Sequence, residues 1–391
     1  MRGSIFLFVC FISFSSHAQS LDDLIFGTEN TFDIVTWNIE NFPKNGQNSI
    51  NYVTQIVEAI DADFIAIQEV SNQSAFQQVV NNLADYNGFL ESTDFDGLAL
   101  LYKPNVLEIN NIYRIYSDPV YWNAFPRAPM IIDVTYNNQK IFIINNHLKC
   151  CGDGTLNLSD NNDEETRRYE ALNLLKTYID INLPNQNVIL LGDLNDELSD
   201  IPSNNVFQNL IDDASNYLFT DYDIALGSNI NWSYPSWPSH LDHILITNEL
   251  FNEFSFLNSS IETIKVDDYL SGGWSEYDEN VTDHRPVGLK LFIDSNLGVD
   301  DITNNLSIDF YNYPNPFNPT TNVRFDNPKS THVKIIIYNA LGKEITTLVN
   351  EKLNAGSYEV DWDATNYPSG VYFYKLTSGD FSSIRKMVLL K

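Results

Sequence analysis

The sequence predicts an α/β fold over most of the chain and a small all-β domain at its C-terminal end. Between residues 32 and 293, short apolar runs typical of buried strands alternate with segments of helical character. Beyond residue 309, apolar and polar residues alternate between Gly, Asn and Pro turns, which is the pattern of a small β-sandwich. A length of 391 residues fits two or three such units, because a domain takes roughly 150 residues.

Composition supports this division and restricts the partners. The formal net charge is −30, yet the residues from Asp309 onward contain 9 basic and 8 acidic side chains, so the N-terminal part carries the whole excess. With 43% apolar residues the chain can bury a sizeable core. So acidic a protein does not attract nucleic acid or anionic membranes through its overall field, and any phosphate chemistry must be local and helped by cations. Three cysteines exclude a disulfide scaffold.

The first residues have the features of a secretory signal peptide. Arg2 supplies the positive start, 5–14 the apolar run, and 16–18 (Ser-His-Ala) a small-x-small cleavage site. Because that run is too short to span a bilayer, we expect no stable membrane insertion and removal of 1–18, together with Cys10. A buried N-terminal helix or strand is the alternative interpretation.

A polar stretch at 294–308 without hydrophobic periodicity is expected to be a linker to the last domain, 309–391. Within that domain, YPNPFNP at 313–319, GVY at 370–372 and the terminal KMVLLK at 386–391 resemble the C-terminal sorting domain of the type IX secretion system. The resemblance implies a type IX secretion machinery as partner, and a protein that is released or anchored at the cell surface of a Gram-negative bacterium. A plain adhesion or carbohydrate module is the alternative.

In the α/β part, six apolar runs end in or beside a polar side chain that could bind metal or move a proton. Burying an unpaired ionisable group costs several kcal/mol, so six such groups predict convergence at one partly wet edge of a β-sandwich. In chain order they are Asn38, Glu69, His147, Asp193 with Asn195, Asp242 with His243, and Asp283 with His284. Helices are predicted between several of these strands, at about 52–59 and 163–180.

The chemistry of these side chains suggests their roles. Asn38, Glu69 and Asp283 are hard oxygen donors, suited to Mg²⁺ or Mn²⁺ and poorly suited to zinc. A divalent ion held there would polarise a phosphoryl oxygen and neutralise charge on the leaving group. His147 and His284 are able to exchange protons near neutral pH.

The remaining candidates complete a hydrolytic site. Asp242 could accept a hydrogen bond from His284 and fix its tautomer. Asp193 is the candidate to orient or deprotonate the attacking water, and Asn195 could donate to a phosphate oxygen. Arg127 could clamp a phosphate, because its guanidinium fork matches that geometry. No covalent nucleophile with its base is evident, so we expect direct attack by water.

Taken in order, these motifs resemble those of the endonuclease/exonuclease/phosphatase superfamily. The matching strings are TWNIE at 36–40, IQE at 67–69, NNHL at 145–148, GDLND at 192–196, LDHI at 241–244 and TDHRP at 282–286. The resemblance covers a catalytic domain at 30–293. It implies a four-layer α-β-β-α sandwich with two central sheets and metal-dependent hydrolysis of a phosphoester.

The same resemblance carries roles onto individual residues. It makes Glu69 the principal metal ligand, supported by Asn38 and Asp283, and it gives the water and phosphate roles to Asp193 with Asn195. The acid–base machinery is then the Asp242–His284 pair, with His147 as a second phosphate-facing histidine. Arg127 matches less closely, because the family's sequence is loose there.

These observations lead us to expect an exported, Mg²⁺- or Mn²⁺-dependent phosphodiesterase that cleaves nucleic acid as a monomer, with DNA the favoured substrate. The same mechanism on a sphingomyelin or other phospholipid headgroup, or on an inositol phosphate, is the second hypothesis. A non-catalytic surface protein is the third. The aromatic segment 231–240 is expected to cap the sheet edge or to form a stacking wall for a base or a headgroup.

Three further features remain open. Cys150 and Cys151 are either bridged or two buried free cysteines: a vicinal bridge is strained, because adjacent Cα atoms lie about 3.8 Å apart, but exposed thiols are liable outside the cell. The acidic stretches 159–165 and 267–280 are solvated loops or sites for structural Ca²⁺. His240 and His243 are expected to serve packing or loop hydrogen bonds.

Overall fold

The computed structural model describes residues 20–92, 97–293, 310–327, 329–379 and 381–391. The predicted signal peptide at 1–18 and the predicted linker at 294–308 lie outside the described residues. Among the helices that the structure describes, none combines the length and the apolar character needed to cross a bilayer.

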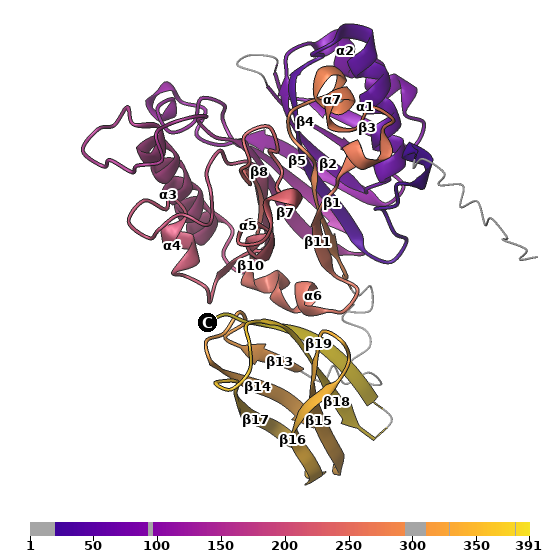
Figure 1. Ribbon diagram of the computed structural model, residues 1–391, viewed down its shortest axis with the longest axis vertical. Helices are drawn as coiled ribbons and strands as arrows, with labels where there is room; N and C mark the ends of the chain where they lie inside the picture. The colour runs from indigo at the N-terminus through magenta and orange to yellow at the C-terminus, as the bar shows by residue number, and fades with distance from the viewer. Residues whose placement is uncertain (1–19, 93–96, 294–309, 328, 380) are drawn as a thin grey trace, which may run out of the picture.

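Two six-stranded mixed sheets form the centre of the N-terminal domain (Figure 1). The strands of the first sheet are β1 (Phe32–Phe42), β2 (Phe64–Val70), β3 (Asn87–Leu90), β4 (Gly97–Tyr102), β11 (Ser260–Thr263) and β12 (Val287–Leu291), in the order β11-β12-β1-β2-β4-β3. Those of the second are β5 (Leu107–Arg114), β6 (Met130–Tyr136), β7 (Gln139–His147), β8 (Asn187–Asp193), β9 (Tyr217–Phe219) and β10 (Asp242–Thr247), in the order β5-β6-β7-β8-β10-β9.

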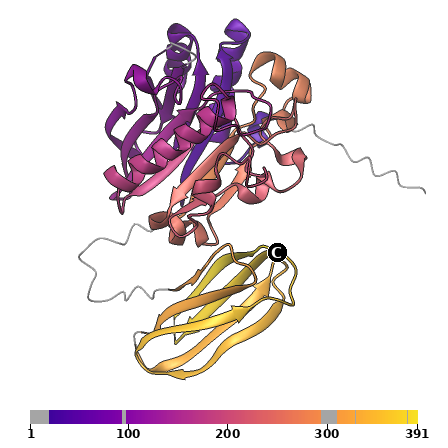
Figure 2. The same ribbon diagram turned by 90° about the vertical axis from the view of Figure 1, so that its left-hand side faces the viewer.

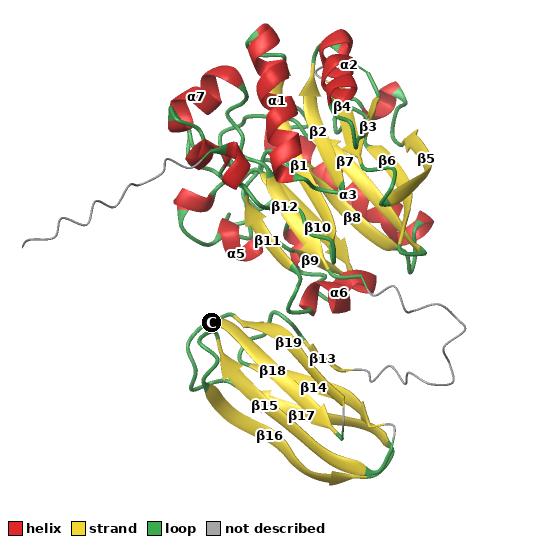
Figure 3. Cartoon of the chain, turned by 90° about the vertical axis from the view of Figure 1, so that its right-hand side faces the viewer, coloured by secondary structure: helices red, strands yellow, loops and turns green. Residues whose placement is uncertain are grey.

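Helices cover both outer faces of this pair of sheets. The first sheet carries α1 (Gly46–Ile60), α2 (Gln73–Asn82) and α7 (Gly273–Asn280), and the second carries α3 (Glu164–Asn182) and α4 (Gln208–Ile211) (Figures 1 and 3). Successive residues of a strand face opposite sides of its sheet. Ile34 therefore packs between the two sheets, whereas Val35 packs under α1. The predicted four-layer α-β-β-α architecture is confirmed.

Both predicted helices form, with shifted ends. The segment predicted at 163–180 is α3, and the Asp163 carboxylate accepts the Thr166 N–H at 2.9 Å as its N-cap. The segment predicted at 52–59 extends to the fifteen residues of α1, since its apolar residues continue in helical spacing from Ile50 to Ile60. Short α5 (Tyr222–Ala225) and α6 (Phe251–Ser255) lie in the later connections.

Strand direction explains why the polar strand ends meet. β1 and β2 run parallel, as do β7 and β8, so the C-terminal ends of each pair lie side by side. β10 and β12 run antiparallel to β8 and β1, so their N-terminal ends lie at that same edge. The register places Asp193 between His147 on one side and Asp242 on the other.

The C-terminal domain is a seven-stranded sandwich, which confirms the predicted all-β fold (Figure 2). One sheet has β13 (Phe310–Tyr313), β14 (Thr320–Asn327) and β17 (Gly356–Asp363), and the other has β15 (Thr331–Asn339), β16 (Glu344–Leu353), β18 (Gly370–Ser378) and β19 (Phe381–Leu389). Its apolar core lies between these sheets. Arg385 on β19 donates to the Asn252 carbonyl and the Ser255 hydroxyl of α6, at 2.9 and 2.8 Å.

Candidate active site

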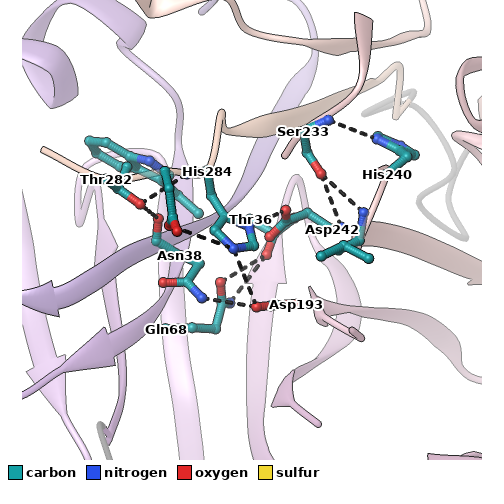
Figure 4. Close-up of polar contacts among 12 residues, drawn as sticks. Thr36, Asn38, Gln68, Asp193, Ser233, His240, Asp242, Thr282 and His284 are labelled. Atoms are coloured by element: carbon teal, nitrogen blue, oxygen red, sulfur yellow. Dashed lines mark hydrogen bonds and ion pairs between the residues drawn. The ribbon is translucent and has the colours of Figure 1, made fainter. Parts of the chain in front are cut away.

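Asn38 joins the two sheets at the edge where the strand ends meet (Figure 4). Its amide Nδ2 donates to Glu69 Oε1 on the neighbouring strand at 3.0 Å and to Asp193 Oδ2 on the second sheet at 2.9 Å. Its Oδ1 accepts the Glu40 N–H at 2.9 Å. One amide therefore fixes two acidic side chains that come from different sheets.

The backbone around Asn38 and Glu69 departs from regular strand geometry. Glu40, Asn41 and Glu69 have φ angles of 35°, 49° and 66°, in the left-handed region that ordinary side chains rarely adopt. The pairing of β1 with β2 shifts register between Asn38 and Phe42, so β1 is bulged at this point. The bulge brings the Asn41 N–H to Glu69 Oε2 at 2.9 Å. Such strain persists where the surrounding structure enforces it, and it is common at functional sites.

His284 lies between two buried carboxylates. Its Nδ1 donates to Asp242 Oδ2 at 2.7 Å, and its Nε2 lies 3.8 Å from Asp193 Oδ2 and 3.9 Å from Asp283 Oδ1. Burial alone would lower the pKa of His284, but the charges of Asp242 and Asp193 outweigh it and raise the pKa to about 10. The imidazole is therefore protonated at neutral pH, with Nε2–H on the side of Asp193 and Asp283.

Asp193 is poised to exchange a proton near neutral pH. Burial raises its pKa to about 7, with the nearby Asp242 and Glu69 carboxylates adding to the rise, while His284 and the Asn38 hydrogen bond act against it. A carboxylate with such a pKa can accept a proton from water at physiological pH. The protonated His284, with Nε2 3.8 Å from Asp193 Oδ2, supplies the compensating positive charge.

His147 is the last member of the group, and its pKa is lowered whereas that of His284 is raised. Its Nε2 lies 3.6 Å from Asp193 Oδ2 and 3.7 Å from Glu69 Oε1, longer than hydrogen bonds. The side chain is 3% exposed, and burial, followed by the positive charges of Arg127 and His284, lowers its pKa well below the usual value. His147 is therefore a neutral imidazole beside a charged one.

The structure thus gathers six of the predicted residues into one polar cluster and places the other three around it. The six are Asn38, Glu69, His147, Asp193, Asp242 and His284. Asp283 Oδ1 lies 3.9 Å from His284 Nε2, and the Asn195 N–H donates to Asp193 Oδ1 at 3.1 Å. Asn195 also donates from Nδ2 to the Leu148 carbonyl at 3.3 Å. Asp283 donates its N–H to Glu40 Oε2 at 3.1 Å, and burial together with the Asp283 charge raises the pKa of Tyr234 to about 12. Arg127 lines a neighbouring cavity of about 210 Å³ beside Trp122.

The donors in this cluster fit a divalent cation. Glu69, His147 and Asp193 keep their ligand atoms within 4.8 Å of one another. Asp193, Asp242 and His284 lie equally close, but the protonated His284, hydrogen-bonded to Asp242, has no free lone pair for a metal. Glu69 and Asp193 supply hard carboxylate oxygens, as Mg²⁺ or Mn²⁺ prefers. Asn38 directs its amide nitrogen toward them and its Oδ1 toward the Glu40 N–H, so its expected part as a ligand stays a prediction. Asp283 belongs to neither of these groups, so its expected part as a ligand stays a prediction.

A buried hydrogen-bond chain that sequence reasoning missed supports His284. Trp37 Nε1 donates to the Tyr277 hydroxyl at 3.1 Å, and that hydroxyl donates to the His284 carbonyl at 2.8 Å. Thr282 Oγ1 donates to the Asn38 carbonyl at 2.9 Å and accepts the His284 N–H at 3.1 Å. Thr282 lies in the TDHRP string and could have been found there; Tyr277 carries no sequence signal.

His240 and His243 hold the loop in front of β10, as hydrogen-bonding residues. Asp221 accepts from His243 Nδ1 at 2.6 Å, from His240 Nε2 at 3.1 Å and from the Ile244 N–H at 3.0 Å. Burial would raise the pKa of Asp221, but the two histidines lower it well below its usual range. His240 Nδ1 in turn accepts the Ser233 N–H at 3.2 Å, which ties the aromatic segment to the site (Figure 4).

The acidic stretches differ from one another. Residues 267–280 are mostly helical, and Asp267 pairs with Arg285 at 2.6 Å, so the expectation of a solvated loop there was wrong. At the start of α3, Asp163 and Glu165 form a group with Asp153 of the preceding loop, and their ligand atoms lie within 4.8 Å of one another. Structural Ca²⁺ at the latter place stays a prediction.

Comparison with known proteins places the chain in a family. A model of the endonuclease/exonuclease/phosphatase family matches residues 35–284, and the chain belongs to this family. A second model, of a secretion-system C-terminal sorting domain, matches residues 311–390. No curated protein matches the chain. Family membership supports a hydrolase function, and enzymes of this family are generally dependent on divalent metals.

Solved structures agree with the fold. TDP2 from D. rerio, in complex with a single-strand DNA product, is 14% identical, with a TM-score of 0.51 over 67% of this chain and 98% of that one. A D. rerio TDP2 humanized by 14 mutations gives 14% identity and a TM-score of 0.50 over the same shares. The human Nocturnin catalytic domain with bound sulfate is 15% identical, with a TM-score of 0.48 over 67% of this chain and 94% of that one. The likeness to the two TDP2 structures, at 14% identity, shows the fold alone.

Proposed function

We propose that the protein is an exported, divalent-metal-dependent phosphodiesterase that cleaves nucleic acid, with DNA as its substrate, by direct attack of water. The observation that carries the proposal is the continuous polar chain from Glu69 through Asn38, Asp193 and His284 to Asp242. The DNA product bound to D. rerio TDP2, which shares the fold, supports DNA as the substrate class.

Glu69 and Asn38 would hold the cation, Mg²⁺ or Mn²⁺, with Asp283 in support. When bound, the ion polarises a phosphoryl oxygen and offsets charge on the leaving group. The neighbouring Asn38 amide keeps Glu69 and Asp193 in fixed positions, so the two carboxylates are arranged before substrate arrives.

The remaining residues would activate water and stabilise charge. Asp193 would orient the attacking water and accept its proton, as its pKa of about 7 allows. The protonated His284, held by Asp242, would donate from Nε2 to a phosphate oxygen. Neutral His147 would donate a second hydrogen bond, with Asn195 and Arg127 available for the flanking phosphates.

A lipid or inositol phosphate substrate is the second candidate, and one observation favours the lipid. Trp237 and Ile230 are 78% and 62% exposed on the segment that also carries Tyr234. The Tyr234 ring lies 4.8 Å from the His284 ring, so this apolar segment borders the polar cluster. It could stack on a base or enter a membrane surface. A non-catalytic surface protein is the third candidate, and the six gathered polar residues argue against it.

The export proposal concerns the whole chain. The predicted signal peptide at 1–18 and the matched sorting domain support secretion through the type IX machinery, with a catalytic domain at 30–293, a linker at 294–308 and a sorting domain at 309–391. We further propose that the enzyme is a monomer. Fractionation of the producing cells into periplasm, surface and medium tests this route.

A substrate panel tests the activity. The purified chain is incubated with plasmid DNA, single-stranded oligonucleotide, RNA, sphingomyelin and inositol phosphate, with Mg²⁺ or Mn²⁺ and then with a chelator. We expect cleavage of DNA that the chelator abolishes. Hydrolysis of sphingomyelin alone would support the second candidate, and failure with every substrate and ion would contradict the enzymatic proposal.

A further inference from the structure

The loop that follows His147 presents two adjacent thiols. Cys150 and Cys151 are both exposed and unbridged, so the expectation of buried cysteines was wrong, and their Sγ atoms lie only 3.0 Å apart. They are the only cysteines left once the predicted signal peptide removes Cys10. Within the mature chain, each can therefore bridge only to the other.

A buried arginine shapes the turn that carries these thiols. Arg168 on α3 is 3% exposed, and its Nη1 donates to the Lys149 carbonyl at 2.9 Å and to the Cys151 carbonyl at 2.6 Å. Its Nε is fixed by Asp196 Oδ2 at 2.8 Å. The guanidinium thus holds the carbonyls on both sides of Cys150, which keeps the two side chains on one side of the turn.

Gly152 completes the turn. Its φ is 121°, and a Cβ there would lie 2.1 Å from Glu165 Oε1, so no other residue fits without displacing the buried glutamate. Cys151 itself has a φ of 70°. The conformation that brings the thiols together is therefore built into the loop by its neighbours.

We propose that Cys150 and Cys151 are a redox modification site that forms a reversible vicinal disulfide by exchange with a disulfide oxidant. Lys149 Nζ lies 3.5 Å from Cys150 Sγ, and we assign Cys150 as the attacking residue because this cation lies beside its sulfur. Cys150 thiolate attacks one sulfur of the oxidant, and one thiolate leaves. Cys151, after losing its proton, attacks Cys150 Sγ and releases the second thiolate. Two cysteine thiols and one disulfide give one cysteine disulfide and two small thiols, both protons passing to the released thiolates.

The proposal is tested on the full chain equilibrated with oxidised glutathione, followed by alkylation and peptide mass mapping, which separates Cys10 from the pair. We expect the peptide with Cys150 and Cys151 to lose both alkylatable thiols, to be lighter by two hydrogens and to carry no glutathione. Thiols that stay alkylatable, a retained glutathione or a bridge between chains would each overturn it.

Single variants test the order of the two steps. Cys151→Ser removes the resolving thiol and is expected to retain one glutathione on Cys150. Cys150→Ser is expected to react more slowly. Faster glutathione capture by Cys150→Ser than by Cys151→Ser would overturn the order of attack.

An arginine variant tests the turn. Arg168→Lys keeps the charge but cannot hold both carbonyls, so the mixed disulfide is expected to accumulate because closure slows. If a folded Arg168→Lys chain forms the Cys150–Cys151 disulfide at the wild-type rate, the proposed role of Arg168 in shaping the turn is wrong. If circular dichroism shows that this variant is unfolded, the two cysteine variants decide the proposal.

Discussion

The His284 imidazole and the Asp193 carboxylate lie 3.8 Å apart, and the protein raises the pKa of both groups above its usual value. His284 Nδ1 donates a hydrogen bond to Asp242. The surrounding negative charge outweighs burial and raises the pKa of His284 to about 10. Burial raises the pKa of Asp193 to about 7, so its carboxyl group keeps a proton until the pH approaches that value. Environments that separate the pKa values of neighbouring groups assign them as acid and base.

This assignment predicts a bell-shaped dependence of kcat/KM on pH. Activity should rise through about 7 as Asp193 loses its proton, and fall through about 10 as His284 loses its own. Initial rates on a DNA substrate at fixed ionic strength and saturating Mg²⁺ measure it. Asp193→Asn should remove the acid limb together with most of the rate. A rate independent of pH between about 6 and 8 would be incompatible with Asp193 as the base.

At the scale of elements, helix α7 and strand β1 are joined to the site through Tyr277. Removing its hydroxyl in Tyr277→Phe leaves Trp37 Nε1 and the His284 carbonyl without their buried partner. We expect the free energy of unfolding to fall by about 1–3 kcal/mol and kcat to fall with it. Urea unfolding and steady-state kinetics measure these changes.

Tyr358→Phe is the matched control for this variant. The Tyr358 hydroxyl donates to the Asn354 carbonyl at an exposed site in the sorting domain. We expect this change to leave both stability and kcat nearly unaltered. Equal effects from the two tyrosine variants would show that the buried chain does not position His284.

Strand β10 is fixed by Asp221, which accepts three hydrogen bonds in the core. Asp221→Asn removes the buried carboxylate that accepts from His243 and His240 and is expected to cost about 3–5 kcal/mol in urea unfolding at neutral pH. Because folding lowers the pKa of Asp221, its contribution is present above the unfolded value and is lost as the pH falls. The difference in unfolding free energy between wild type and Asp221→Asn should therefore become smaller as the pH falls. A difference that stays constant across pH would contradict the ion pair.

The strands could be predicted from the sequence more completely than the geometry of the site. Apolar runs such as 187–193 predicted the buried strands, and parallel strands whose ends carry reactive groups predicted one common edge. The bulge that turns Asn41 toward Glu69 was not predictable, because its positive φ angles arise from tertiary contacts. Asp283 was placed among the metal ligands by its motif, whereas its position beside the polar cluster depends on Glu40.

The whole molecule combines a strongly acidic catalytic domain with a nearly neutral sorting domain. Because the net charge of −30 repels a polyanion, the proposed DNA substrate would have to bind through the site and the cation proposed there. Raising Mg²⁺ at constant ionic strength should therefore lower KM as well as raise kcat, in a rate assay on an oligonucleotide. A KM that does not respond to Mg²⁺ would show that DNA binds elsewhere.

The central claim is that the residues gathered at the sheet edge hydrolyse a phosphodiester with a bound divalent cation. Plasmid cleavage by wild type, Glu69→Ala and His284→Ala in Mg²⁺ tests it, with circular dichroism confirming that each chain is folded. We predict that each substitution lowers the rate about 10²–10⁴-fold, since a positioned acid–base group contributes on that order. Wild-type rates in both folded variants would contradict the account.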